Sequence, residues 1–212
     1  PEVVRQKLQQ ELGRPIDEVF AEFDDTPIAS ASIGQVHRAR LHTGEAVAVK
    51  VQHADIEQKV YVDLDILAGL AQMAQMIEEF QNYRPQAIVE EFRRTLSNEL
   101  DFSRELRNMQ QIARHFGKDS SLRIPRTYPE YSTNRVLIME FMEGISLGER
   151  ERLEQSGVDL AALARSGAEI YMRMIFEHGF YHADPHPGNI LVLDGDVFGL
   201  LDYGMVGRID ET

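Results

Sequence analysis

Apolar residues recur at helical spacing over several long stretches of the chain. The pattern predicts a long helix over residues 55–80, with apolar positions at Ile56, Val60, Leu64, Leu67, Leu70, Ala74 and Ile77. Pro85 suits the first turn of a second helix, because its missing N–H is not needed there. A third helix is expected to run to Phe116, with Gly117 as a left-handed cap. Residues 159–178 predict an amphipathic helix that stops at Gly179.

Other stretches have the pattern of strands. After a short helix in residues 1–12, a second short helix is expected from Ile16 to Phe23. Apolar and β-branched runs on either side of residues 42–45 then predict two or three antiparallel strands joined by a hairpin turn. Residues 123–141 predict two strands around residues 132–134. Residues 190–204 predict a hairpin that turns at Asp194-Gly195-Asp196.

The order of these elements defines the expected fold class. Strands come first, then helices, strands, a helix, a polar loop and a final hairpin, which is the order of an α+β protein. With 212 residues, 43% of them hydrophobic, the chain is long enough for one medium domain or two small lobes. The chain begins at Pro1 rather than at a methionine, which indicates an excised or trimmed fragment.

Composition excludes several classes of function. The chain has no cysteine, so disulfides and thiolate metal sites are excluded. Its formal charge is 22 − 35 = −13, which disfavours binding to nucleic acid, because that binding relies on basic surfaces. No apolar run reaches the ~18 residues that would span a bilayer, and no signal peptide is visible. We therefore expect a cytoplasmic protein, or one peripheral to a membrane.

The first candidate for chemistry is an alanine-rich loop, Ala29-Ser30-Ala31-Ser32-Ile33-Gly34-Gln35-Val36. Its spacing matches the glycine loop of kinases, G-x-G-x-x-G-x-V, with Ala29 and Ala31 in place of the first two glycines. Such a loop brings backbone N–H groups close to phosphate oxygens. Because alanine tolerates positive φ poorly, we expect a stiffer loop than one made of glycine. A small-residue β-turn with no ligand is the alternative for this motif alone.

Lys50 ends the apolar strand Ala46-Val47-Ala48-Val49-Lys50, 14 residues after Val36. A lysine that points inward from a strand needs an anion, since burying an unpaired ammonium is costly. Three carboxylates, Glu99, Asp101 and Glu105, lie in one segment of seven residues, and one of them could be the partner. The alternatives are a solvated edge-strand lysine and a solvated acidic helix face.

The polar loop HADPHPGN, residues 182–189, has the spacing H-x-D-x-x-x-x-N of a kinase catalytic loop, with Asp184 and Asn189 in place. Asp202-Tyr203-Gly204 follows 13 residues after Asn189, where kinases have D-F-G. Carboxylate and amide oxygens are the ligands that Mg²⁺ prefers. These motifs, in this order, predict a site for phosphoryl transfer from ATP.

A metal site is the rival explanation for the same loop. His182, Asp184 and His186 could begin a Zn²⁺ or Fe²⁺ site, because imidazole and carboxylate are common ligands of both metals. That explanation does not account for Lys50 or Asp202, and the prolines flanking His186 are more simply explained as rigid loop residues.

Together, the segments ASASIGQVHRA, VAVKVQ, NELDFSRE, HADPHPGN and LDYG resemble the UbiB-type atypical kinases, also called the AarF-domain or ADCK group. The resemblance runs from about Thr26 to Gly207. An alanine-rich loop in place of the glycine loop is itself typical of that family. Two features depart from it: the K-x-G-Q motif of the family does not occur, and the chain ends eight residues after Gly204.

The resemblance implies a protein-kinase-like bilobal fold that binds ATP and Mg²⁺. It implies a β-rich N-lobe with inserted helices, residues 1–142, and a truncated helical C-lobe, residues 143–212. It makes Lys50 the phosphate-orienting lysine, Glu105 its helix partner and Asp184 the catalytic aspartate. Glu99 and Asp101 become the E-x-D pair of the family.

The metal ligands and the nucleotide-binding residues follow from the same resemblance. Asn189 and Asp202 would hold Mg²⁺. The remaining nucleotide-binding positions would be Ala29, Ala31, Ser32, Ile33, Gly34, Val36, Ala48, Met139, Glu140 and Met142. Met139 would lie near the gatekeeper position of a hinge over residues 139–143.

The resemblance links the chain to ubiquinone or other isoprenoid-lipid metabolism, with partners among the proteins of such a pathway and with peripheral membrane contact. Two other functions remain open. One is a small-molecule kinase of the aminoglycoside or choline kinase type, whose loop H-G-D-x-H-x-G-N is similar to HADPHPGN. The other is a non-catalytic scaffold that changes conformation when ATP binds.

Overall fold

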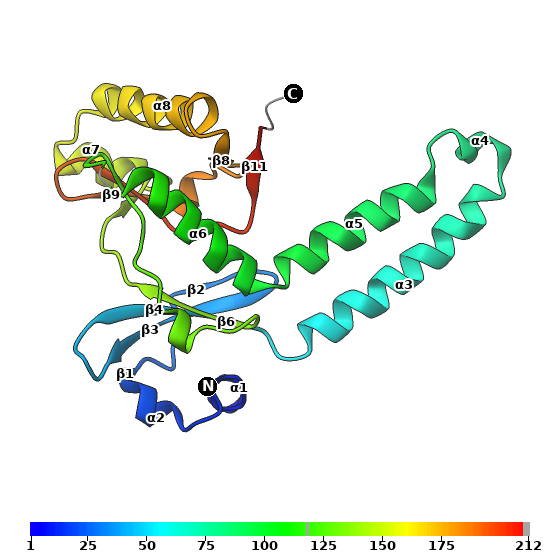
Figure 1. The fold of residues 1–212 in the computed structure, drawn as a ribbon, viewed down its shortest axis with the longest axis horizontal. Coiled ribbons are helices and arrows are strands. Elements are labelled where there is room, and N and C mark those ends of the chain that lie inside the picture. The colour runs from blue at the N-terminus through cyan, green and yellow to red at the C-terminus, as the bar shows by residue number, and fades with distance from the viewer. Residues whose placement is uncertain (118, 210–212) are drawn as a thin grey trace.

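A computed structural model describes residues 1–117 and 119–209. The first lobe is built on an antiparallel sheet in the order β1-β3-β4-β6, with β2 paired to β3 (Figure 1). Its strands are β1 (Phe20–Phe23), β2 (Ala29–Ser30), β3 (Gly34–Leu41), β4 (Ala46–Gln52) and β6 (Val136–Glu140). The helices α1 (Glu2–Leu12) and α2 (Ile16–Val19) pack below it, and Leu8 and Ile16 are buried against one face of the sheet. The predicted hairpin turn at residues 42–45 is confirmed.

The second lobe contains two small sheets and two helices. One sheet has the order β5-β10-β9-β7, and the other pairs β11 with β8. The strands are β5 (Leu122–Arg123), β7 (Ile145–Ser146), β8 (Phe180–His182), β9 (Ile190–Leu193), β10 (Val197–Leu200) and β11 (Val206–Arg208). The helices are α7 (Arg150–Ser156) and α8 (Leu160–Phe176), with the short 3₁₀ turn η2 (Pro187–Asn189). A further 3₁₀ turn, η1 (Pro129–Tyr131), packs against β6 of the first lobe. The predicted hairpin at residues 194–196 is confirmed, since β9 pairs with β10 across it.

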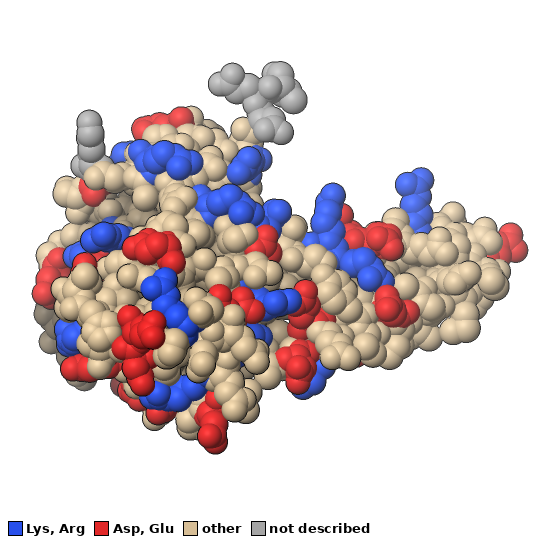
Figure 2. Space-filling model, turned by 60° about the horizontal axis from the view of Figure 1, so that its bottom comes forward, with Lys and Arg blue, Asp and Glu red and all other residues tan. Residues whose placement is uncertain are grey.

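A helical hairpin projects from the body of the molecule (Figure 1). It consists of α3 (Ile56–Gln75), α4 (Glu78–Gln81) at its tip and α5 (Pro85–Glu99), with Pro85 at the first position as expected. Only Leu64 and Ala71 are buried in α3, and no residue is buried in α4 or α5. Apolar side chains of the hairpin, such as Ile66 and Met73, are therefore exposed. Much of the hairpin surface in Figure 2 is neither acidic nor basic, whereas acidic and basic side chains are interspersed over the body. No helix among the described residues is long and apolar enough to cross a membrane.

The helix α6 (Phe102–Phe116) lies between the two lobes (Figure 1). One of its faces is apolar and buries Phe102, Met109, Ile112 and Phe116 in a core shared by both lobes. Its N-terminus is capped by Asp101, whose carboxylate accepts a hydrogen bond from the backbone N–H of Ser103 at 3.0 Å. Because α6 is anchored along one face, the position of every side chain on it is set by the packing between the lobes.

Three local expectations are wrong. The helix expected from Ile16 to Phe23 stops at Val19, because residues 20–23 form strand β1 against β3. Of the two strands expected around residues 132–134, the second is present as β6, but the first is not: only Leu122–Arg123 form a strand, β5, in parallel with β10, and Thr127 makes an isolated bridge to Met139. Gly117 has φ −61° and is not a left-handed cap, whereas Gly179 after α8 has φ +56°. In the first two cases, long-range pairing overrides the local pattern.

The expected α+β class and the division into two lobes are confirmed. The boundary expected between residues 142 and 143 stays a prediction. Strand β5 comes before that boundary in the chain, yet it pairs with β10 after it.

Candidate functional site

A cavity of about 660 Å³ lies between the two lobes. It is covered by the alanine-rich loop and bordered by the segment that connects the lobes. Nearly all of the predicted site residues line it. They are Ala29, Ala31, Ser32, Ile33, Gly34, Val36, Ala48, Lys50, Glu105, Met139, Glu140, Met142, Asn189 and Asp202. Asp184 is not among the lining residues. The structure therefore brings residues from positions 29 to 202 to one cavity.

Lys50 is the cation of this cavity. It extends from β4, and its Nζ lies 2.7 Å from Glu105 Oε2 and 3.1 Å from Asp202 Oδ2. The ammonium also lies 5.1 Å from the centre of the Phe102 ring. Glu105 is only 3% exposed, and its Oε1 accepts a hydrogen bond from the backbone N–H of Tyr203 at 3.3 Å. The predicted pair of Lys50 with Glu105 is thus present, and it reaches the segment of Asp202 as well.

The charges in this network shift the pKa of each member. Burial alone would lower the pKa of Lys50, but the carboxylates of Glu105 and Asp202 outweigh burial and raise it. Burial raises the pKa of Glu105, against the opposing charge of Lys50. Burial would also raise the pKa of Asp202, yet Lys50 and the backbone N–H of Gly204 lower it overall. Lys50 and Asp202 are therefore charged at neutral pH.

The three neighbouring carboxylates have three different environments. Glu105 holds Lys50, whereas Asp101 caps α6 and lies 3.6 Å from Arg107. Glu99, the last residue of α5, lines the cavity, and its pKa is raised by burial and by the charge of Asp202. The sequence offered Glu99 as one of three possible partners of Lys50, and the family resemblance made it one of the E-x-D pair. The charge of Lys50 opposes this rise in the pKa of Glu99 but does not cancel it.

Gly204 lies between Glu99 and Asp202. A Cβ at this glycine would come within 3.3 Å of both the Asp202 Oδ1 and the Glu99 Oε2. The two carboxylates thus approach the same point from different elements, α5 and the segment after β10. Asn189 lines the same cavity. A set of carboxylate and amide oxygens on one side of a cavity fits Mg²⁺, which prefers hard oxygen ligands.

His182 connects the polar loop to the Asp202 segment. Its Nδ1 accepts a hydrogen bond from the backbone N–H of Asp184 at 3.1 Å, so its Nε2 carries the proton and donates to the carbonyl of Asp202. His186 accepts from the backbone N–H of Gly188. Both nitrogens of His182 are used within the protein. The described residues contain no group of three histidine or acidic side chains that could hold a metal, so the rival metal site gains no support.

The alanine-rich loop is a short hairpin without backbone strain. Ala29 pairs with Val36, and the backbone N–H of Ala31 donates to the carbonyl of Gly34 at 2.8 Å. Neither Ala29 nor Ala31 has positive φ, so the turn does not need glycine at those positions. Gly34 is different, because a Cβ there would lie 2.6 Å from the carbonyl oxygen of Val51. Glycine is required at this position because β3 and β4 approach each other closely there.

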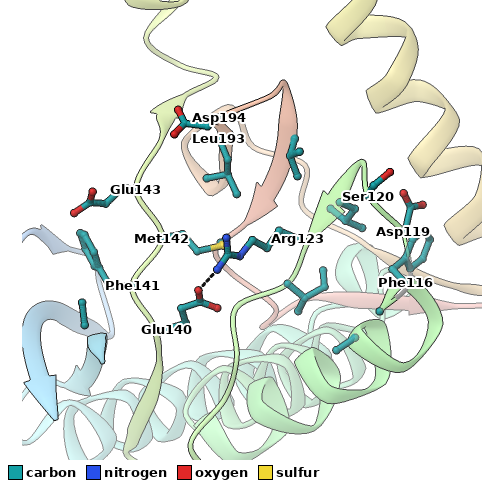
Figure 3. Close-up of a pocket in the computed structure, with 16 residues that line it drawn as sticks. Phe116, Asp119, Ser120, Arg123, Glu140, Phe141, Met142, Glu143, Leu193 and Asp194 are labelled. Atoms are coloured by element: carbon teal, nitrogen blue, oxygen red, sulfur yellow. Dashed lines mark hydrogen bonds and ion pairs between the residues drawn. The ribbon is translucent and has the colours of Figure 1, made fainter. Parts of the chain in front are cut away.

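The segment 140–143 joins the lobes and forms one wall of the nucleotide-sized cavity. A second cavity of about 680 Å³ lies behind it, and residues 140–143 line both. In Figure 3, Arg123 reaches into this rear cavity and pairs with Glu140, and Met142 points toward it. The same Glu140 carboxylate accepts from the backbone N–H of Arg126 at 3.1 Å. The connecting segment is therefore held from behind by the strand segment 123–126.

The fold and the cavity define the chain as a protein-kinase-like protein. Comparison with known proteins gives the family. The model of the ABC1 atypical kinase-like domain matches residues 1–212, and the chain therefore belongs to that family. The family resemblance inferred from the sequence is confirmed.

Named relatives agree with this assignment. AarF domain-containing protein kinase 1 of Xenopus tropicalis is 43% identical over 218 residues, which cover 100% of this chain and 41% of that protein. Probable protein kinase UbiB of Tolumonas auensis is 37% identical and covers 99% of this chain and 40% of that protein. The solved complex of Rv3197 with erythromycin, from Mycobacterium tuberculosis, has a TM-score of 0.77 and 32% identity. It covers 97% of this chain and 51% of that chain. The chain spans about two fifths of the length of the curated relatives.

Proposed function

We propose that the chain binds Mg-ATP and acts as an atypical kinase or ATPase of the UbiB type. The observation that supports this most directly is the position of Lys50, which contacts Glu105 on α6 and Asp202 on the Asp-Tyr-Gly segment at the same time. A charged lysine between two carboxylates is stable without a ligand. Phosphate oxygens entering the cavity would share this ammonium with Glu105, which would keep it oriented.

Different residues of the cavity would bind the adenine, the phosphates and Mg²⁺. Ala48, Met139 and Met142 line the end of the cavity beside the connecting segment and would contact the adenine. The backbone of the alanine-rich loop would face the phosphates. Asn189 and Asp202 would hold Mg²⁺, and Glu99 lies close enough to Asp202 to join them. When bound, Mg²⁺ neutralises negative charge on the phosphate oxygens.

Asp184 would orient or deprotonate the attacking hydroxyl or water. It lies on the loop beside the cavity rather than in its wall, and the hydrogen bond of its backbone N–H to His182 holds the start of that loop. An acceptor or water would then approach from the loop side. The pKa of Glu99 is raised mainly by burial and by the charge of Asp202, and Asp184 adds to this effect, which supports a position of Asp184 on the same side of the cavity.

A link to ubiquinone or other isoprenoid-lipid metabolism, with partners in such a pathway, is the biological context we propose. It is supported by the resemblance to UbiB-type kinases and by the relative named UbiB. Peripheral contact with a membrane is part of the same proposal. The family match favours this function over a small-molecule kinase of the choline or aminoglycoside type.

The experiment is calorimetric titration of ATP and ADP with and without Mg²⁺, followed by analysis of the products. We expect Mg²⁺-dependent binding that is weakened in Lys50→Met and in Asp202→Asn. Arg94→Gln on the exposed side of α5 is the control and should bind as the unaltered chain does. Normal ATP turnover in both cavity variants would refute the proposal. Binding without turnover, unchanged in Asp184→Asn, would instead favour the ATP-dependent scaffold.

A further inference from the structure

Four arginines gather on the outer face of α6 and on β11. Arg104, Arg107 and Arg114 lie on the exposed face of α6, and Arg208 ends β11. They line a shallow pocket with a volume of about 420 Å³, whose lining also includes Asn108 and Gln111. In a chain with a formal charge of −13, such a concentration of guanidinium groups is unexpected.

Within residues 1–117 and 119–209, few carboxylates pair with these arginines. Most of the other described arginines form an ion pair with a carboxylate. Of these four, only Arg107 has a carboxylate partner among the described residues, Asp101 at 3.6 Å. Arg208 donates to the neutral side chain of Gln111 at 3.3 Å and lies over the ring of Phe180. Guanidinium groups that converge without carboxylates are the usual recognition elements for phosphate.

We propose that this arginine cluster, Arg104, Arg107, Arg114 and Arg208, binds a small ligand with a phosphate or diphosphate group. A small anion needs only the local positive charge. An extended polyanion or an anionic membrane would also face the many carboxylates of the rest of the surface, which repel it. The concave shape favours the same ligand class, because it allows several guanidinium groups to reach one phosphate.

The position of the cluster couples it to the cavity between the lobes. The helix α6 carries both the arginines and Glu105, the partner of Lys50. Asn108 lines the same pocket as the arginine cluster, and its side chain donates a hydrogen bond at 2.8 Å to the carbonyl of Tyr203, the residue after Asp202. A phosphate bound by α6 and Arg208 together would hold α6 against the segment that carries Asp202. This effect on the nucleotide rests on the proposed function, whereas phosphate binding itself does not.

The test is titration of inorganic phosphate and pyrophosphate, without Mg²⁺, into the 212-residue chain that carries Lys50→Met. This background removes the cation of the nucleotide cavity. We expect binding to persist there and to weaken by about tenfold or more in Arg104→Gln/Arg107→Gln/Arg114→Gln, since each charge-assisted hydrogen bond contributes more than a neutral one. The control is Arg94→Gln/Arg150→Gln/Arg152→Gln, which changes the net charge equally and removes only exposed local ion pairs.

Amide hydrogen exchange gives a second readout. Phosphate should slow exchange in α6 and in residues 203–208, with or without Lys50→Met. Equal weakening in both triple variants, or no weakening in either, would overturn the proposal. If the cluster variant unfolds, Arg104→Gln and Arg114→Gln are tested singly, because both side chains are exposed. Binding only to phosphatidylglycerol vesicles, and not to the soluble anions, would also overturn it and would identify a membrane surface.

Discussion

At the scale of single residues, Lys50, Glu105 and Glu99 show that similar charges can have opposite energetic roles. Lys50 and Glu105 stabilise each other in a buried position. Burial raises the pKa of Glu99, the charges of Asp202 and Asp184 add to the rise, and the charge of Lys50 opposes it. The first pair supports the fold, whereas ionisation of Glu99 is disfavoured in the folded chain.

Replacing Lys50 with methionine should destabilise the chain strongly. Glu105, 3% exposed, would remain in the core without its cation. Removing one partner of a buried pair typically costs about 3–5 kcal/mol of unfolding free energy, and partial exposure of Lys50 suggests roughly the lower end. Urea unfolding at neutral pH measures the change.

The matched controls are Lys50→Met/Glu105→Gln, which should recover part of the loss, and Arg40→Met. Arg40 makes an exposed pair with Glu22 at 3.3 Å, and its loss should cost less than about 1 kcal/mol. If Lys50→Met and Arg40→Met were equally destabilising, the buried pair would not have the role that its geometry indicates.

Glu99→Gln should stabilise the ligand-free chain at neutral pH. The folded pKa of Glu99 is raised above its ordinary value, so the folded state binds the proton more tightly than the unfolded state. Its contribution to stability therefore falls as pH rises from the ordinary pKa through the folded pKa. The gain from Glu99→Gln should be present at neutral pH and vanish at acidic pH.

Thermal unfolding as a function of pH measures this gain, with Glu90→Gln on the exposed part of α5 as the control. The same variant should lower the Mg²⁺ dependence of ATP binding. A Glu99→Gln variant with unchanged stability at every pH would show that the carboxylate is not held against negative charge.

At the scale of elements, the break between α5 and α6 organises the site. The chain leaves α5 at Glu99 and re-enters a helix at Phe102, with Asp101 as the cap. Gln52 from β4 donates to the carbonyl of Leu100, and this contact fixes the break to the sheet. The break lets Glu99 and Glu105 face the same cavity from two helices.

At the scale of elements, Gly34 is a position where substitution is costly. Gly34→Ala would place a Cβ 2.6 Å from the carbonyl oxygen of Val51, where β3 and β4 pair. We expect a loss of about 1–3 kcal/mol in unfolding free energy, because backbone atoms must shift to relieve the contact. Nucleotide affinity should fall as well, since Gly34 is part of the alanine-rich loop that lines the cavity.

Gly69→Ala is the matched control for this substitution. Gly69 lies inside α3 on an exposed face, with no atom within 4 Å of an added Cβ. Alanine there should stabilise the helix by about 0.5–1 kcal/mol. Chemical denaturation compares the two variants, and a tolerated Gly34→Ala would mean that β3 and β4 can separate without cost.

At the scale of the whole molecule, the projecting hairpin and the two-lobed body differ in how much they bury. The hairpin of α3, α4 and α5 buries only Leu64 and Ala71 among its helical residues, whereas β4 and α6 lie in the shared cores. Yet α5 ends in Glu99, at the cavity. The hairpin is therefore connected directly to the cavity through the carboxylate of Glu99.

Amide hydrogen exchange should resolve this difference. Amides in α4 and in the adjoining ends of α3 and α5 should exchange faster than those in β4 and α6, because local opening is easier where few apolar groups are buried. Addition of Mg-ATP should slow exchange in α6 and around Asp202 more than in α4. Equal protection of α4 and α6 without ligand would contradict the buried-surface argument.

Much of the chemistry could be predicted from sequence because it depends on local spacing. The loop 182–189 and the segment 202–204 hold their polar residues through short-range contacts, such as that of His182 with Asp184, so the spacing reports the geometry. The strand 46–50 and the hairpin 190–200 are similarly local. The order of these motifs was sufficient to predict the family, and nearly all of the predicted site residues line one cavity.

The tertiary structure alone decided which carboxylates face the cavity and what each one does. Glu99, Asp101 and Glu105 lie within seven residues, and their roles separated only because α5 ends at Glu99 and α6 begins at Phe102, with Asp101 as its cap. The parallel pairing of β5 with β10 and the approach of Gly34 to Val51 also depend on segments distant in the chain. The physical reason is the same in each case: burial and pairing between distant segments act over a few ångströms in space, and spacing along the chain does not encode that distance.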